Sequence, residues 1–190
     1  ANIAYASDGI TGLANEEVTI SDTSVSATAL NILDGNTSGT VNASTVTTIT
    51  GTTAAANSAY ASIGISNLGN EAVTISDISI DVADLNTLDG NTTGEVNVST
   101  LATLTGETAA INTAYASDGI TGLANEAVTL SDTTLAVATL NTLDGATSGT
   151  VTASSVTTIT GTTAAANIAY ASDGITGLAN EEVTISDTSV

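Results

Sequence analysis

Short stretches in which apolar and polar residues alternate recur along the chain. They read Val-Thr-Ile-Ser from Val18, Thr-Val-Asn-Ala-Ser from Thr40 and Thr-Val-Thr-Thr-Ile-Thr from Thr45. Alternation with a period of two places the apolar side chains on one face of an extended strand, and Val, Ile and Thr favour that conformation. The pattern therefore predicts short strands that each bury one face.

Segments with helical signals lie between such strands. Residues 81–90 begin with Asp81, a candidate N-cap, contain good helix formers and end at Gly90. Residues 106–117 follow the same scheme, with Thr108 as the candidate cap. Both segments are too short to stay helical alone in water, so we expect packing against the strands to hold them.

A 55-residue period runs through the whole chain. The string DGITGLANE, or its variant IGISNLGNE, starts at Asp8, Ile63, Asp118 and Asp173. The four tyrosines are the only aromatic residues and follow the same period, at Tyr5, Tyr60, Tyr115 and Tyr170. The period divides the chain into repeats at 8–62, 63–117 and 118–172, a partial repeat at 173–190, and the end of a preceding repeat at 1–7.

The chain also has a second, longer period. Residues 1–25 and 166–190 have the same sequence, letter for letter, and the offset between them is three whole repeats. Self-similarity at a fixed period is the mark of a solenoid or an array. We therefore expect residues 1–190 to be a single continuous solenoid segment, taken from a longer and nearly uniform array.

Each repeat divides into two weakly related parts. The segment from Val128 parallels the segment from Val151, a step of 23 that leaves 32 for the other part. Coils of roughly this size occur in solenoids. The predicted fold is a β-rich, right-handed solenoid in which short parallel strands stack and short helices close the turns, with about two coils per 55-residue repeat. A straight β-solenoid with irregular corners fits the pattern nearly as well.

The composition of the chain limits the partners it can bind and the reactions it can catalyse. The chain has 20 acidic residues and no Lys, Arg or His, so its net charge is −20, and it has no Cys. Nucleic acid is excluded as a partner and anionic membranes are disfavoured, because binding them needs Lys and Arg. No apolar run is long enough for membrane insertion. We expect no enzyme: nucleophile pairs with His are absent, and a uniform repeat offers no single place for a catalytic carboxylate pair.

An acidic turn in the first two repeats is a candidate calcium site. Oxygen ligands stand at alternate positions and a glycine follows, as in the first half of a calcium-binding loop. The candidate ligands are Asp34, Asn36, Ser38, Asp89, Asn91, Thr93 and Glu95. Thr45 or Thr100 occupies the place of the bidentate glutamate, so a helix C-cap that leads into a Gly-rich turn is the alternative. No cofactor is required in either case.

Equivalent carboxylates of successive repeats are predicted to form columns. Two coils of about 4.8 Å would separate them by about 10 Å. Their repulsion is weak in salt and stronger in dilute buffer. We therefore expect divalent cations or salt to stabilise the array diffusely.

Two further motifs point to surface chemistry. Asn-X-Ser/Thr sequons make four asparagines candidates for glycosylation, namely Asn36, Asn42, Asn91 and Asn97. Such sequons arise easily by chance in a chain so rich in Asn, Ser and Thr. Thr-rich stretches such as residues 156–163 resemble the threonine arrays of ice-binding solenoids, although strand propensity explains them more simply.

Three strings carry a family resemblance: LNTLDGNTTG, VTTITGTTAAAN and AYASDGITGLANEAVTLSDTTL. They resemble the tandem-repeat regions of very large bacterial secreted and cell-surface proteins of the cyanobacterial type, among adhesin-like and haemolysin-type proteins. The resemblance covers the whole chain. It implies an extracellular or cell-surface location and a structural or adhesive role, and it carries over no catalytic or ligand residue.

Two functions are compatible with these features. The first is a structural component of an extracellular filament, stalk or surface layer, whose partner is the protein itself through coil stacking, filament growth or lateral assembly. The second is an adhesin shaft, a binding module that uses a repeated face to bind a glycan, a divalent cation or ice. The drift from Asn36 and Asn91 to Ala146 between repeats favours the first, because a recognition face needs constant residues.

Overall fold

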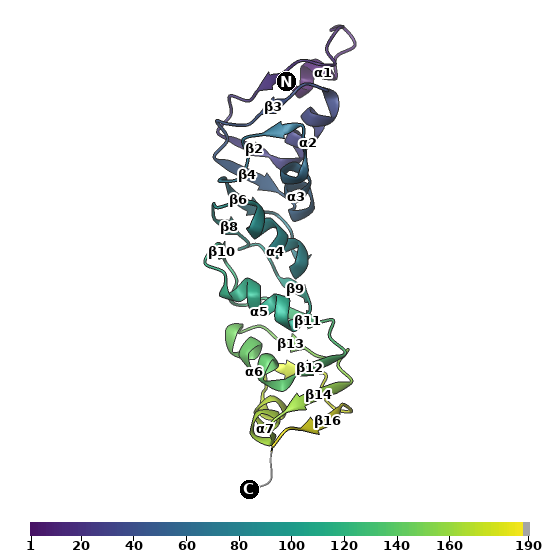
Figure 1. Ribbon diagram of the computed structural model, residues 1–190, viewed down its shortest axis with the longest axis vertical. Coiled ribbons are helices and arrows are strands. Elements are labelled where there is room, and N and C mark those ends of the chain that lie inside the picture. The colour runs from purple at the N-terminus through teal and green to yellow at the C-terminus, as the bar shows by residue number, and fades with distance from the viewer. Residues whose placement is uncertain (188–190) are drawn as a thin grey trace. The chain divides into compact units, whose positions relative to one another are not determined.

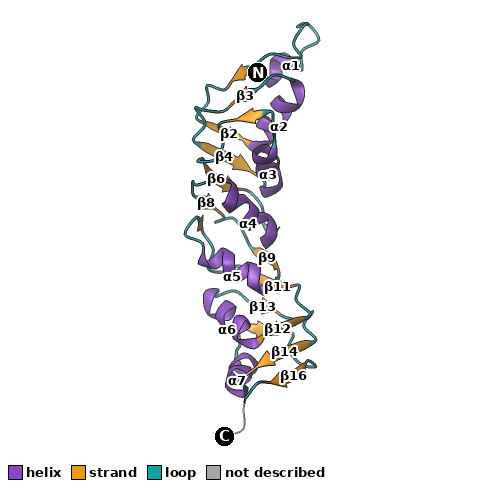
Figure 2. Ribbon diagram, viewed as in Figure 1, coloured by secondary structure: helices purple, strands orange, loops and turns teal. Residues whose placement is uncertain are grey.

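The structure, a computed structural model, describes residues 1–187 (Figure 1). Short strands and short helices alternate along the chain (Figure 2). They form two compact units, Ala1–Asp77 with Thr87–Val98, and Ile78–Asn86 with Ser99–Val190. Each unit has the stacked parallel strands of a repeat solenoid, as the sequence predicts. Residues 188–190 of the partial repeat lie outside the described part, and the continuity of the segment from 1 to 190 stays a prediction.

The elements of the first unit are helices α1 (Asn2–Tyr5), α2 (Ala27–Asn36) and α3 (Thr53–Ala61) and strands β1 (Val18–Thr19), β2 (Ser24–Ser26), β3 (Val41–Asn42), β4 (Thr48–Gly51), β5 (Ile65–Ser66), β6 (Ala72–Ile75) and β8 (Val96–Asn97). Helix α4 (Val82–Asn91) crosses the sequence border between the units.

The elements of the second unit are helices α5 (Thr108–Ala116), α6 (Val137–Ala146) and α7 (Thr163–Ala171) and strands β7 (Ser79–Asp81), β9 (Thr103–Gly106), β10 (Ile120–Thr121), β11 (Ala127–Leu130), β12 (Thr134–Ala136), β13 (Val151–Thr152), β14 (Thr158–Gly161), β15 (Ile175–Thr176) and β16 (Glu182–Ile185).

Strands pair in parallel with strands one coil away. In the first unit β1, β3 and β5 form one row, and β2, β4, β6 and β8 form another. In the second unit the rows are β7-β9-β11-β13-β15 and β12-β14-β16. Val18 pairs with Val41 and Val41 with Ile65, and the other pairs show the same steps of 23 or 24 in residue number. One coil therefore advances the residue number by 23 or 24.

This coil length corrects the division of the repeat. The two coils from Val18 to Ile65 are together eight residues shorter than the 55-residue repeat. The unequal division of the repeat into 23 and 32 therefore does not separate two coils. The step of 23 from Val128 to Val151 is one coil, because these two residues pair between neighbouring strands. The other 32 residues of the repeat contain a second coil of 23 or 24 residues and the eight-residue excess.

The eight-residue excess moves equivalent strands into different sheets. β6 is the equivalent of β1 one repeat later and β8 that of β3, so the β6–β8 pair repeats the β1–β3 pair, yet the two pairs lie in different sheets and β6 also pairs with β4. Equivalent carboxylates therefore do not stack, and the predicted columns are wrong. The column neighbour of Asp81 is Thr105 and that of Glu182 is Thr158, so hydroxyl side chains stand beside these carboxylates.

The predicted strands are present but shorter. Residues 18–21 and 40–44 contain β1 and β3. In residues 45–50 the strand β4 begins only at Thr48, because a turn precedes it in which the Val46 N–H donates to the Ala43 carbonyl at 2.9 Å.

Burial alternates along the strands as the sequence pattern predicts. In β6 Val73 and Ile75 are each 1% exposed, while Ala72 and Thr74 beside them are exposed. The apolar residues therefore point to the core and the others to solvent.

Both predicted helices form. α4 begins after Asp81, whose Oδ1 accepts the Ala83 N–H at 2.8 Å, so the predicted cap is confirmed. Gly90 does not end this helix but lies inside it, one residue before its last residue, Asn91.

The cap predicted for α5 is wrong. Its N-cap residue is Glu107, which makes no side-chain cap bond, and Thr108 is the first helical residue. The Thr108 N–H and hydroxyl instead donate to Asp132 Oδ2 at 2.7 and 2.8 Å. A residue one coil later therefore caps this helix.

Small and aliphatic side chains fill the core of each unit, in agreement with a narrow coil. The largest fully buried aliphatic ones are Leu30, Ile49, Ile75, Leu85, Leu88, Leu104, Ile111, Leu130, Leu140, Leu143 and Ile159. Strands contribute alternate residues and helices one side, such as Leu30 and Leu33 of α2. No helix within residues 1–187 is long and apolar enough to cross a membrane.

Candidate functional site at the contacts between coils

A buried carboxylate organises one corner of the coil. Glu71 is 0% exposed, and its Oε2 accepts the Tyr60 hydroxyl at 3.0 Å and the N–H groups of Gly69 and Asn70 at 2.9 and 3.2 Å. Its backbone carbonyl accepts the Thr92 hydroxyl from the next coil at 2.7 Å. Neutral donors therefore bind Oε2 of this carboxylate in a chain that has no basic side chain, whereas its buried Oε1 has no hydrogen-bond partner.

The same corner recurs in each repeat. A tyrosine hydroxyl donates to a glutamate 11 residues later in the pairs Tyr5–Glu16, Tyr60–Glu71, Tyr115–Glu126 and Tyr170–Glu181. The next coil follows closely behind this glutamate: a Cβ on Gly94 would overlap the Glu71 carbonyl oxygen, and Gly39 and Gly149 are equally close to Glu16 and Glu126. We call this Tyr–Glu–Thr arrangement the corner cluster.

Burial shifts the acid–base behaviour of the corner cluster. Desolvation raises the pKa of Tyr115 to about 12, and the Glu126 carboxylate beside it adds to the rise although the Thr147 hydroxyl opposes it. Desolvation raises the pKa of Tyr60 as well, with Glu71 adding to it. The phenols therefore stay neutral donors at any ordinary pH.

Aspartates join three helices, α3, α5 and α7, to the coil that follows each of them. Asp77 Oδ2 accepts the N–H and hydroxyl of Thr53 at 2.7 and 3.0 Å, which caps α3. Asp132 does the same for α5, and Asp187 accepts the Thr163 N–H of α7 at 2.7 Å. The bonds from the Thr163 hydroxyl and N–H lower the pKa of Asp187.

Asparagines link successive helices. Asn31 of α2 donates from Nδ2 to the Ala55 carbonyl of α3 at 2.9 Å, and Asn141 of α6 donates to the Ala165 carbonyl of α7 at 3.0 Å. Within each unit, successive coils are thus bonded through strand pairs, aspartate caps, asparagine bridges and corner clusters.

The predicted calcium ligands of the first repeat point to different partners. Asp34, near the end of α2, accepts the Ser62 hydroxyl on Oδ2 at 2.6 Å. Ser38 donates to the Ala14 carbonyl at 3.3 Å, and Asn36 is exposed at the last residue of the helix. The helix end and the bend after it match the alternative, a C-terminal turn.

In the second repeat Asn91 Nδ2 donates to Asn57 Oδ1 at 3.2 Å and the Thr93 hydroxyl to the Gly69 carbonyl at 3.3 Å. Asp89 and Glu95 have interactions of their own. Across residues 1–187 no three carboxylate, imidazole or thiolate groups are placed to share a metal ion. A calcium site at this turn stays a prediction that no ligand cluster supports.

The four sequon asparagines differ in accessibility. Asn36 is exposed, whereas Asn42, Asn91 and Asn97 are half-buried. Asn42 Oδ1 also accepts the Asn67 side chain at 2.9 Å and the Ser44 N–H at 3.0 Å. Asn36 is therefore the most accessible of the four candidates.

Sequence reasoning missed the glutamates of the corner cluster and the capping aspartates. The available signal was constancy between repeats: Glu16, Glu71, Glu126 and Glu181 are all glutamate, although the residue after them varies between Glu and Ala. An acidic residue beside a Gly-rich turn reads as solvated, so its burial could not be inferred from the sequence.

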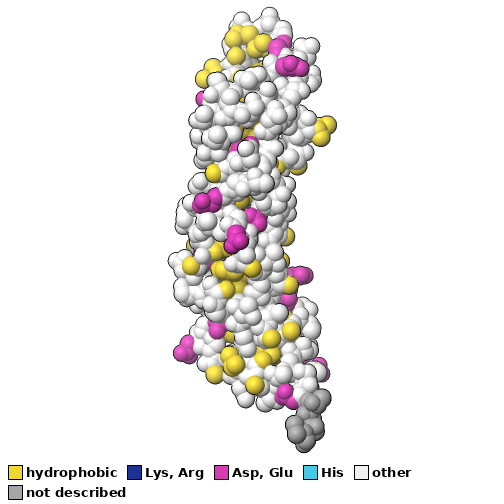
Figure 3. Space-filling model, turned by 60° about the vertical axis from the view of Figure 1, so that its left-hand side comes forward, with side chains coloured by type: hydrophobic (Ala, Val, Ile, Leu, Met, Phe, Trp, Pro, Cys, Tyr) yellow, Lys and Arg dark blue, Asp and Glu magenta, His cyan; other side chains and the backbone are white. Residues whose placement is uncertain are grey.

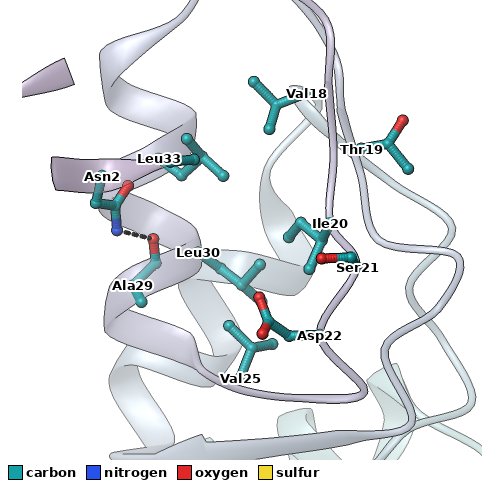
Figure 4. Close-up of a pocket in the computed structure, with 11 residues that line it drawn as sticks. Asn2, Val18, Thr19, Ile20, Ser21, Asp22, Val25, Ala29, Leu30 and Leu33 are labelled. Atoms are coloured by element: carbon teal, nitrogen blue, oxygen red, sulfur yellow. Dashed lines mark hydrogen bonds between the residues drawn. The ribbon is translucent and has the colours of Figure 1, made fainter. Parts of the chain in front are cut away.

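The first coil leaves a cavity of about 180 Å³, lined by both polar and apolar residues and open on one side (Figure 4). Val18, Ile20, Val25, Leu30 and Leu33 line it, and Asn2 on its wall donates to the Ala29 carbonyl at 3.0 Å.

Asp22 also lines this cavity. It is the equivalent of Asp77, which caps a helix at Thr53, 24 residues earlier.

On the face drawn in Figure 3 the acidic side chains are scattered among uncharged ones. No protein-family model, curated protein or solved structure matches the chain. Its function is therefore inferred from the geometry.

Proposed function

We propose that the chain is a structural component of an extracellular filament, stalk or surface layer. The observation that carries this proposal is that, within each unit, successive coils are joined by the same small set of bonds. Such contacts involve only nearest neighbours, so length can be added by copying the repeat. The partner in this function is the protein itself.

The corner cluster supports a structural rather than a catalytic role. It contains two titratable groups, the half-buried Tyr60 and the buried Glu71, which are the kind of groups that active sites use. The cluster recurs in each repeat, however, and its groups bond to one another and to the next coil. Repetition of one closed arrangement fits stabilisation of the stack, not one reaction centre.

The sheet surface supports a structural role over an adhesin shaft. A repeated recognition face needs one residue type at one repeat position along a column. The outward column of the second unit reads Asp81, Thr105, Thr129, Thr152 and Thr176, which are five different positions of the repeat. The eight-residue excess mixes repeat positions in this way, so no carboxylate or amide is constant along the column, which weakens a repeated cation face. The four threonines of the column leave a glycan or ice face as the alternative.

The extracellular location rests on the resemblance to secreted bacterial repeat regions and on composition. A chain without Lys or Arg gives trypsin-like proteases no cleavage site. This property suits a persistent material outside the cell.

Electron microscopy of the native material tests the function. A stacked solenoid predicts unbranched fibres with an axial spacing of about 4.8 Å and a rise of about 11 Å per repeat, which is two coils and a third of another. Discrete globular particles without these spacings would exclude the filament. Fibres that also bind a glycan array or ice crystals would favour the adhesin shaft.

A further inference from the structure

Asp–Gly bonds occur in this chain in two structural settings. One setting is the interior of a helix, in α2, α4 and α6, and the other is the turn or bend that follows α1, α5 and α7. An Asp–Gly bond is where an aspartate rearranges most readily, because glycine has no side chain to shield its nitrogen from the neighbouring carboxyl group. The helical bonds begin at Asp34, Asp89 and Asp144, and the other bonds begin at Asp8, Asp118 and Asp173.

Packing fixes the glycine after the helix, whereas the residue before it is not fixed. A Cβ on Gly174 would overlap Oδ1 of Asp144, and a Cβ on Gly64 would overlap Oδ1 of Asp34. The residue before Gly64 is Ile63, which is fully exposed. The fold therefore requires glycine at this position of the repeat but does not require an aspartate before it.

The helical Asp–Gly bond at Asp144 is restrained from two sides. Gly145 lies in α6, where a backbone N–H donates to the carbonyl four residues earlier. Oδ2 of Asp144 accepts the Ser172 hydroxyl at 2.7 Å. Attack of the Gly145 nitrogen on this carboxyl group would therefore have to break both bonds.

The bond at Asp118 has neither restraint. Asp118 lies in a bend and is exposed, two residues after α5 ends at Ala116. The Gly119 N–H donates to the Ser117 hydroxyl at 3.1 Å, a side-chain acceptor in place of a helical carbonyl. The Asp118 carboxyl group can therefore rotate onto the Gly119 nitrogen without opening a helix.

We propose that the bend after α5 makes Asp118 a site of spontaneous isoaspartate formation in the folded chain, whereas Asp144 is protected. The Gly119 nitrogen attacks Cγ of Asp118, loses its proton and expels a hydroxyl group, so one water molecule leaves and a five-membered succinimide remains. Water then adds back to one of the two carbonyl carbons. Opening at the main-chain carbon gives isoaspartate, and opening at Cγ restores aspartate.

The product changes the main chain but not the charge. Isoaspartate routes the chain through Cβ and Cγ, which lengthens it by one atom directly before Ile120. Ile120 is 8% exposed, so the extra atom disturbs a core side chain. The reaction needs only water, and it is therefore independent of the proposed function.

Ageing the intact chain at neutral pH and physiological temperature tests the proposal. A protease that cuts before aspartate but not before isoaspartate, followed by mass spectrometry, reports each site separately. We expect isoaspartate at Asp118 to exceed that at Asp144 by about tenfold or more, because two hydrogen bonds protect Asp144. Equal amounts at the two sites would overturn the proposal. So would a folded chain without isoaspartate at Asp118 when the chain unfolded in guanidinium chloride forms it there.

Ile63→Asp provides a matched gain of the site. It places an Asp–Gly bond in the equivalent bend of another repeat, where the Gly64 N–H donates to the Ser62 hydroxyl at 3.0 Å. The variant should form isoaspartate at position 63 at a rate comparable to that at Asp118, and circular dichroism checks that it is folded. Asp118→Ile should lose the product at position 118 and stay folded, since Ile63 already occupies the equivalent position. A folded Ile63→Asp chain that stays unmodified at position 63 while Asp118 reacts would overturn the role of the bend.

Discussion

At the scale of single residues, the corner cluster gives a buried carboxylate neutral donors on one oxygen, Oε2, in a chain without cationic side chains. Glu71 lies in the interior, where an ionised group without partners would be several kcal/mol unfavourable. Backbone N–H groups and the Tyr60 hydroxyl replace the missing cation. The turn before Glu71 and the coil after it are thereby fixed to the same residue.

The closeness of the next coil predicts a sharp effect at Gly94. A methyl group there would overlap the Glu71 carbonyl oxygen, so we expect Gly94→Ala to lower the free energy of unfolding by about 1–3 kcal/mol. Gly90→Ala is the matched control, because it lies inside α4 with open space around it and should be stabilising by about 0.5–1 kcal/mol. Urea unfolding midpoints measure both, and equal midpoints would contradict the packing of this corner.

The raised pKa of Tyr115 predicts a loss of stability in alkali. The folded chain holds this phenol neutral up to about pH 12, whereas the unfolded chain loses the proton near pH ~10. The contribution is therefore fully present below about pH 10 and is lost as the pH rises towards 12. Phenolate absorbance should show a late ionisation step in the folded protein that disappears in Tyr115→Phe. A Tyr115→Phe titration identical to that of the parent chain would contradict this.

At the scale of elements, the N-terminus of α5 is capped by the coil that follows it. Removing the cap of α5 with Asp132→Ala should lower the free energy of unfolding by about 1 kcal/mol, the usual value of an N-cap. Asp118→Ala removes the same charge at an exposed position that already holds Ile63 in another repeat, and should change stability by less than about 0.5 kcal/mol. Thermal melts compare the two, and equal effects would show that charge, not capping, is responsible.

Local signals made the elements predictable. The alternation from Val18 and the cap at Asp81 both depend on residues within one strand or one helical turn. The cap of α5 was mispredicted because its partner, Asp132, is 24 residues away and no local rule connects the two.

The sequence repeats reveal the length of only one of the two coils in each repeat. The step from Val128 to Val151 is one coil, but the next coil places unlike repeat positions beside each other and leaves few identical pairs, such as Thr152 with Thr176. The burial of Glu71 was hidden for a similar reason, because the groups that enclose it come partly from Thr92 and Gly94 of another coil.

At the scale of the whole molecule, the net charge of −20 determines the response to salt. The chain has no Lys, Arg or His, so added salt screens repulsion between side chains and weakens no side-chain ion pair. The Debye length falls from about 30 Å at ~0.01 M to about 8 Å at ~0.15 M. We expect the melting temperature to rise by about 2–4 °C or more over this range, which corresponds to about 1 kcal/mol.

Divalent ions extend this test. MgCl₂ and CaCl₂ at equal ionic strength should raise the melting temperature equally, because the expected stabilisation is diffuse. A larger effect of calcium, reversed by EDTA, would support the ligands predicted around Asp34 and Asp89. Indifference to every salt would contradict the electrostatic argument itself.

The eight residues by which a repeat exceeds two coils determine how such an array can be lengthened by recombination. This excess is about a third of a coil, so three repeats amount to about seven whole coils. Gain or loss of one repeat therefore rotates all later residues by about a third of a turn around the solenoid axis. Gain or loss of three repeats leaves the position of each later residue around that axis unchanged. The identity of residues 1–25 with 166–190 is the trace that duplication in phase-preserving blocks of three would leave.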